Sequence, residues 1–275
     1  MSSFGSRLSD AFTAKGQLCI GIDPSQQQLS NWSLPDSAFG AREFALEMLD
    51  ACVNRVGIVK PQVSFFEQFG PAGLTVLSEI LVRARQAGLL VIADAKRGDI
   101  GSSMTGYTRA WLSEEASFEA DALTLSPFLG VESLRPAVET ALQNKKGVFL
   151  LSATSNPEAL AIQSAIRADV SIASQVAAFA SSFNESALGS VGCVVGATVS
   201  FTDLGISESS FANTPVLMPG FGAQGVALEA VGRKFGPLGA NLICSVSRSV
   251  AGESREGLVE RISLSSTELR QGMIN

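Results

Sequence analysis

Eight short apolar runs recur along the chain, and segments with helical spacing lie between them. Most of the runs are nearly continuous in Val, Ile, Leu and Ala, as in parallel strands that are covered on both faces. The segments between them carry apolar residues three and four positions apart, which is typical of amphipathic helices. The predicted strands are residues 17–23, 57–61, 89–95, 120–126, 147–153, 192–197, 215–219 and 240–245, and the predicted helices include 41–55, 72–87, 131–144, 171–185 and 225–235.

This alternation predicts an α/β fold, a single (β/α)8 TIM barrel that occupies residues 1–275 as one domain. Strand and helix alternating eight times in a chain of this length is the pattern of such a barrel. The polar segment 2–17 predicts an additional N-terminal helix. An open Rossmann-like sheet is the alternative, because it uses the same strand–helix units. In a barrel, functional side chains gather at the carboxyl ends of the strands.

Composition excludes several classes of function. The net charge is −6 with no block rich in Lys or Arg, which argues against nucleic acid or an anionic membrane as partner. No segment resembles a signal peptide or reaches the roughly 20 apolar residues of a membrane span, so we expect a cytoplasmic protein with four reduced cysteines. Histidine is absent, which excludes a Ser-His-Asp triad and a His-ligated zinc.

Charged residues cluster at the end of the third predicted strand and the end of the strand before it. Residues two apart share a face of a strand, so Asp94 and Lys96 should point the same way. Lys60 ends the preceding strand, and Asp99 adds a carboxylate from the following loop. A buried salt bridge is the structural alternative for any one pair, but four such residues converging at a barrel mouth favour a catalytic site.

Two further segments predict contacts with a ligand. Residues 219–225 form a glycine-rich turn between a strand and a predicted helix, where backbone N–H groups can approach an anion. Arg248 follows the eighth strand, and barrels commonly bind phosphate after strands seven and eight. Ser155 follows the fifth strand, where it could contact a polar substrate edge or belong to a turn that opens a helix.

The pattern Asp94-x-Lys96-x-x-Asp99-Ile100, with Lys60 upstream and Asp23 at the first strand end, resembles the orotidine 5′-phosphate decarboxylase family. Residues 153–158 and 59–62 resemble its longer bacterial subtype, and the likeness extends from about residue 19 to 250. The Asp-x-Lys-x-x-Asp pattern alone is shared with related barrel enzymes that act on sugar phosphates. Its combination with the other two segments is more specific.

The resemblance implies decarboxylation of orotidine 5′-phosphate to UMP and CO2 in de novo pyrimidine biosynthesis, by a homodimer that uses no cofactor and no metal. It implies that Lys96 donates a proton to C6. It also implies a charged network of Lys60, Asp94, Lys96 and Asp99, in which Asp99 reaches the partner's site. By the same resemblance, Asp23 and Lys60 contact the ribose, and Ser155 contacts the pyrimidine. Gln224 and Arg248 contact the phosphate, and Ser103 supplies a hydroxyl group. The chain departs from many members in having Ser247 before Arg248, where they have glycine.

Three rival functions remain open from the sequence. A sugar-phosphate barrel enzyme, such as a hexulose phosphate synthase or a keto-sugar phosphate decarboxylase, would use Mg²⁺. An aldolase would form a Schiff base on Lys60 or Lys96. A catalytically silent nucleotide-binding protein would bind UMP and leave orotidine 5′-phosphate unchanged.

Overall fold

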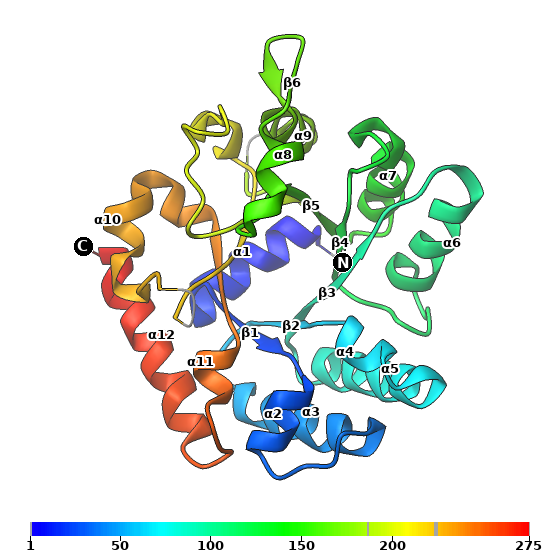
Figure 1. The fold of residues 1–275 in the computed structure, drawn as a ribbon, viewed down its shortest axis with the longest axis vertical. Helices are drawn as coiled ribbons and strands as arrows, with labels where there is room; N and C mark the ends of the chain where they lie inside the picture. The colour runs from blue at the N-terminus through cyan, green and yellow to red at the C-terminus, as the bar shows by residue number, and fades with distance from the viewer. Residues whose placement is uncertain (1, 186, 223–224, 275) are drawn as a thin grey trace.

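A computed structural model describes residues 2–274 apart from 186 and 223–224. Eight parallel strands close into a barrel, with helices around it, in the order β1-β10-β9-β8-β5-β4-β3-β2 (Figure 1). This confirms the predicted barrel and excludes the open sheet, and every predicted strand has its counterpart within a few residues. The barrel strands are β1 Leu18–Ile22, β2 Ile58–Pro61, β3 Leu90–Arg97, β4 Ala122–Leu125, β5 Gly147–Ala153, β8 Val191–Val195, β9 Val216–Pro219 and β10 Leu242–Val246.

Several helices begin at a serine whose side chain caps the first turn. The hydroxyl groups of Ser3, Ser37 and Ser171 each accept a backbone N–H in the first turn of the following helix. None of the helices in the described part of the chain is long and apolar enough to cross a membrane. The α-helices are α1 Phe4–Lys15, α2 Gln26–Asn31, α3 Ala38–Cys52, α4 Ser64–Glu67, α5 Gly70–Gln86, α6 Gly101–Leu112, α7 Arg135–Gln143, α8 Leu160–Gln163, α9 Ile172–Ser181, α10 Val231–Phe235, α11 Arg248–Ala251 and α12 Leu258–Ile274.

Two segments differ from the sequence-based expectation. The helix predicted at 225–235 is wrong in its first part, since a 3₁₀ turn begins only at Leu228–Ala230 and α10 follows it. Gly225 has φ of 96° and Val226 forms a β-bridge with Phe221, so the chain stays extended there. The segment after β5 also contains an antiparallel hairpin, β6 Ile166–Arg167 and β7 Val170–Ser171, which the sequence analysis did not predict.

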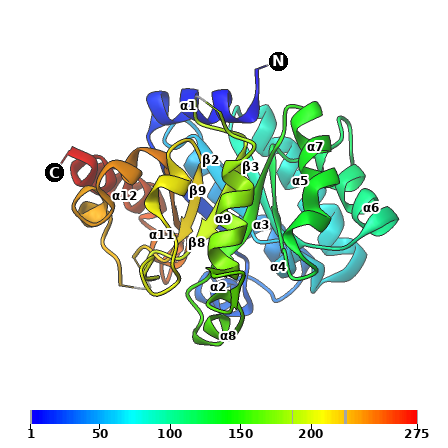
Figure 2. The same ribbon diagram turned by 90° about the horizontal axis from the view of Figure 1, so that it is seen from above.

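Helix α1 closes the amino-terminal end of the barrel (Figure 2). Phe4 and Leu8 are fully buried and belong to the cluster of apolar side chains that fills the barrel interior. The Phe4 ring meets Phe149 of β5 edge-on, with ring centroids 6.0 Å apart. A Cβ on Gly147 would lie 2.4 Å from the Phe4 ring, so only glycine leaves room for that ring at the start of β5. The opposite, carboxyl-terminal end is left open for a site.

Candidate active site

The barrel interior changes from apolar to polar toward the carboxyl ends of the strands. Ile58, Ile92 and Ala122 lie in the interior apolar cluster. Because side chains alternate along a strand, the residues two positions further on face the same interior. Those positions are Lys60 of β2, Asp94 of β3 and Thr124 of β4, three neighbouring strands, and Gly21 of β1 and Ser245 of β10 continue the layer.

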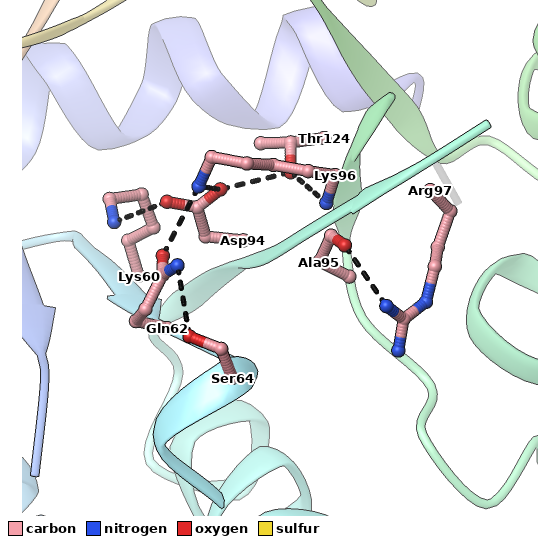
Figure 3. Close-up of polar contacts among 8 residues, drawn as sticks. All are labelled: Lys60, Gln62, Ser64, Asp94, Ala95, Lys96, Arg97 and Thr124. Carbon is pink, nitrogen blue, oxygen red and sulfur yellow. Dashed lines mark hydrogen bonds and ion pairs between the residues drawn. The ribbon is translucent and has the colours of Figure 1, made fainter. Parts of the chain in front are cut away.

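Lys60, Asp94 and Lys96 form one continuous row of charges (Figure 3). Lys60 Nζ lies 2.9 Å from Asp94 Oδ2, and Lys96 Nζ lies 2.7 Å from Asp94 Oδ1. Lys96 Nζ also donates to Gln62 Oε1 at 3.4 Å. The Lys60 side chain is 8% exposed, whereas that of Lys96 is 44% exposed. Of the four residues that the sequence predicts to converge, these three are joined by ion pairs, and Lys96 is the more exposed of the two ammonium groups.

The row holds its members ionised. Burial acts to raise the pKa of Asp94, but the charges of Lys60 and Lys96 outweigh it and keep that pKa well below its usual range. Burial acts to lower the pKa of Lys60, and the carboxylates of Asp94 and Asp23 outweigh it and keep that pKa above its usual range. At neutral pH, Asp94 is thus a carboxylate and Lys60 an ammonium.

A cavity of about 340 Å³ opens beside Lys60 at this end of the barrel. Asp23 Oδ1 is buried and has no hydrogen-bond partner among the described residues, so it can accept a hydrogen bond from a ligand. Arg248, the first residue of α11, is exposed and also lines this cavity. The full lining is Asp23, Ser25, Gln28, Lys60, Phe65, Pro219, Gly220, Phe221, Ser245, Ser247 and Arg248.

The glycine-rich turn packs on the start of α11, next to Arg248. Gly220 and Gly222 have φ of 114° and 71°, in the region that favours glycine. A Cβ on Gly222 would lie 2.7 Å from the hydroxyl oxygen of Ser249, so the turn packs closely on the start of α11. Gln224, the other predicted phosphate contact, lies outside the described residues.

Three predicted site residues are not bonded to the charged row. Asp99 Oδ1 accepts the N–H of Ile100 at 2.8 Å, and Ser103 is exposed on α6. Ser155 is exposed after β5, where its Cβ lies beside Gly196. Within residues 2–274 as described, none of the three side chains hydrogen-bonds to Lys60, Asp94 or Lys96.

Two residues of the site lie at strand ends that the sequence indicated, but sequence reasoning assigned them no role. Thr124 donates its hydroxyl to Asp94 Oδ1 at 3.0 Å and accepts the N–H of Lys96 at 2.9 Å. Gln62 forms a β-bridge with Asp94 and accepts from Lys96 Nζ. The signal for Thr124 was its place two residues after the apolar core position of β4, in the strand next to Asp94.

A larger cavity, of about 800 Å³, lies at the opposite end of the barrel beneath α1. Two carboxylates of this cavity are already paired with cations: Asp121 with Arg7, and Glu119 with both Arg85 and Lys146. The row at the carboxyl end instead leaves the Lys96 ammonium exposed, the Asp23 oxygen unpartnered and Arg248 accessible. The smaller cavity is therefore the candidate active site.

Comparisons with known proteins agree over most of the chain. The family model "Orotidine 5′-phosphate decarboxylase / HUMPS family" matches residues 16–257. A Streptomyces coelicolor protein named orotidine 5′-phosphate decarboxylase is 44% identical over 256 residues, covering 91% of this chain and 90% of that protein. A Corynebacterium glutamicum protein of the same name is 42% identical over 254 residues, covering 90% of each.

A solved structure extends the likeness to the fold. The crystal structure from Streptomyces avermitilis described as an orotidine 5′-phosphate decarboxylase superposes with a TM-score of 0.95 at 40% identity, covering 100% of this chain and 97% of that one. With matches of this extent in sequence and in fold, the chain belongs to the orotidine 5′-phosphate decarboxylase / HUMPS family.

Proposed function

We propose that this chain decarboxylates orotidine 5′-phosphate to UMP and CO2, in de novo pyrimidine biosynthesis, without a metal or an organic cofactor. One observation carries the proposal: a single carboxylate, Asp94, lies between the ammonium groups of Lys60 and Lys96 at the mouth of the barrel. The names and similarity of the relatives support this reaction over others of the same fold.

The chemistry requires what this row supplies. Breaking the bond from C6 to the carboxylate leaves the electron pair on C6, where the pyrimidine ring offers no adjacent electron sink. Fixed charges in the site must stabilise that carbanion. The accessible Lys96 ammonium lies where it can do so and then transfers its proton to C6 as general acid, after which water reprotonates the amine. Asp94 places negative charge beside the departing carboxylate and favours its loss.

The cavity next to the row suits the rest of the nucleotide. Asp23, with its unpartnered buried oxygen, and Lys60 would bind the ribose hydroxyl groups. Arg248 beside the glycine turn would bind the phosphate, a pairing that guanidinium groups make with two parallel hydrogen bonds. By the family resemblance, Gln224 adds a phosphate contact, Ser155 contacts the pyrimidine edge and Ser103 contributes its hydroxyl.

The charged row also argues against a Mg²⁺-dependent mechanism. Both oxygens of Asp94 accept hydrogen bonds from ammonium groups, so this carboxylate has little capacity left for a cation.

The deciding experiment is turnover of orotidine 5′-phosphate by the purified protein in EDTA, followed by the loss of orotate absorbance. We expect turnover to persist in EDTA and to be insensitive to borohydride. Turnover that needs added Mg²⁺ would favour the sugar-phosphate rival. Inactivation by borohydride in the presence of substrate would favour a Schiff-base aldolase, and UMP binding without turnover would favour a silent nucleotide-binding protein.

Lys96→Ala tests the proton donor. We expect turnover to become undetectable, because both the cation beside C6 and the transferable proton are lost, while UMP binding remains measurable by calorimetry. Lys15→Ala, at the opposite end of the barrel, is the matched control and should keep full activity. Retained turnover in Lys96→Ala would remove this residue from the proposed mechanism.

Arg248→Ala tests the phosphate contact. We expect UMP to bind roughly 10- to 100-fold more weakly, since charged hydrogen bonds are lost. Affinity for uridine, which has the same base and ribose but no phosphate, should stay the same. Equal weakening for both ligands, or for neither, would contradict the assignment.

We further propose that the active protein is a cytoplasmic homodimer in which Asp99 completes the partner's site. The apolar side chains of Ile100, Phe128 and Leu129 are exposed at the ends of β3 and β4, with Phe128 75% exposed. Gly98 and Ser126 hold these two loops in direct contact. Exposed apolar groups gathered in this way are typical of a subunit interface. Asp99 lies among them, separate from its own chain's Lys60 and Asp94.

A further inference from the structure

Lys96 has a backbone conformation that is unusual for its place in the fold. Seven non-glycine residues of the described chain have positive φ, and Lys96 alone among them lies within a strand, with φ of 48°. The other six lie in turns. A side chain in this left-handed region is strained, so something in the surroundings must hold Lys96 there.

The register between β3 and β4 shows where this conformation comes from. Ala93 pairs with Leu123 and Arg97 pairs with Leu125, so β3 takes four residue steps where β4 takes two. The extra residues of β3 place Lys96 outside the regular hydrogen bonding between the two strands. Its backbone N–H bonds the hydroxyl oxygen of Thr124 at 2.9 Å instead of a carbonyl oxygen of β4 (Figure 3).

The Thr124 hydroxyl is also linked to the ammonium group of Lys96, because both bind the Asp94 carboxylate. Thr124 donates to Asp94 Oδ1 at 3.0 Å, and that oxygen accepts from Lys96 Nζ at 2.7 Å. A hydroxyl has one proton to donate and lone pairs to accept, so Thr124 uses its donor on Asp94 and an acceptor site on Lys96. The Thr124 side chain itself is fully buried.

We infer that Thr124 is a positioning residue for Lys96: one buried hydroxyl holds both the strained backbone of Lys96 and the carboxylate that receives its ammonium group. The inference rests on the proposed decarboxylation, in which Lys96 is the proton donor. A displacement near 1 Å of a reacting group can lower a rate by about 100-fold, so the loss of these two bonds should be seen in catalysis.

Thr124→Val tests this, because it keeps the shape of the side chain and removes the hydroxyl. We expect kcat for orotidine 5′-phosphate to fall about 10- to 100-fold while KM changes by less than about threefold. Thr124→Ser keeps the hydroxyl and should retain kcat within about threefold of the wild type. Thr214→Val makes the same change at a fully buried threonine that precedes β9, at the other end of the barrel, and should leave kcat unchanged.

A crystal structure of Thr124→Val gives a second readout that does not depend on activity. We expect φ of Lys96 to leave the positive region, or the distance from Lys96 Nζ to Asp94 Oδ1 to exceed 3.5 Å. If the wild type does not decarboxylate orotidine 5′-phosphate, the proposed function fails, and this readout still tests the role of Thr124. Thr124→Cys, which offers only a weak sulfur partner, replaces the valine variant if that variant does not fold. Wild-type kcat in Thr124→Val, or an unmoved Lys96, would overturn the inference.

Discussion

Asp94 shares its carboxylate between two ammonium groups, and one of them, Lys60, is buried with no other acidic group of the described residues hydrogen-bonded to it. Asp94→Asn keeps the shape of the side chain but removes the carboxylate that is hydrogen-bonded to the buried Lys60 ammonium, which leaves only the charge of Asp23 to oppose it. We expect the free energy of unfolding to fall by about 3 to 5 kcal/mol at neutral pH, measured by urea denaturation. Adding Lys60→Met should recover most of that loss. A double variant as unstable as Asp94→Asn alone would show that the cost does not come from the unpaired ammonium.

The pH dependence of this pair follows from the directions of its pKa shifts. The pKa of Asp94 is lowered on folding, so its contribution to stability is present above its unfolded value of about 3.9 and is lost as pH falls through the lower folded value. The pKa of Lys60 is raised, so its contribution is present below about 10.4 and is lost as pH rises through the higher folded value.

Stability from the pair should therefore stay constant across the neutral range. We expect the difference in unfolding free energy between the wild type and Lys60→Met/Asp94→Asn to be flat from about pH 5 to 9 and to change below about pH 4. Urea denaturation at a series of pH values measures it. A steady slope between pH 5 and 9 would mean that one member of the pair titrates there.

Single residues also show how far the sequence could predict the site. Lys60, Asp94 and Lys96 could be brought together from strand ends alone, because neighbouring parallel strands place their final side chains side by side. The left-handed backbone of Lys96 and its bond to Thr124 could not be predicted, since both depend on the register shift between β3 and β4. Register is a property of two strands, and a sequence pattern describes one strand at a time.

Among the elements, α1 closes the barrel floor with side chains that touch no part of the proposed site. Phe4 is fully buried against Phe149. We expect Phe4→Ala to lower the free energy of unfolding by about 3 to 5 kcal/mol, because it leaves a cavity in the barrel interior, with kcat unchanged below the melting temperature. Phe39→Ala is the matched control. Phe39 is exposed on α3, so this substitution should lower the free energy of unfolding only slightly. A marked loss of kcat in Phe4→Ala at a temperature where it is folded would mean that the two barrel ends are coupled.

Elements whose burial is uniform were predictable, and those shaped by single backbone angles were not. β5 matches its predicted bounds because Gly147–Ala153 is an apolar run covered on nearly its whole length. The helix predicted from residue 225 begins late because Gly225 and the bridge at Val226 keep the chain extended. The hairpin β6–β7 turns through Ala168 and Asp169, both with positive φ, a conformation that their residue types do not signal strongly.

In the whole molecule, the packing of α1 and the proposed catalytic groups lie at opposite ends of the barrel. The ion pairs of Asp121 and Glu119 and the α1 side chains lie at the amino-terminal end, while the unpartnered oxygen of Asp23, Arg248 and the cavity of the candidate active site lie at the carboxyl end. The proposed dimer adds to the second end, because Asp99 and the exposed Phe128 lie there. A site that needs Asp99 from a partner is incomplete in one chain, so its activity should depend on assembly.

Mixing two inactive variants tests that dependence. Lys96→Ala and Asp99→Ala should each be inactive as pure proteins, because every site then lacks one of the two groups. In a mixed dimer, one site combines the intact Lys96 of one chain with the intact Asp99 of the other, and the second site lacks both. Random assembly makes half of the dimers mixed, so refolding the variants together should restore about a quarter of the wild-type turnover. Phe128→Glu, placed in both variants, should prevent assembly and abolish the recovery, with the monomer measured by light scattering. If Asp99 instead served its own chain's site, mixing would restore no turnover at any ratio of the two variants.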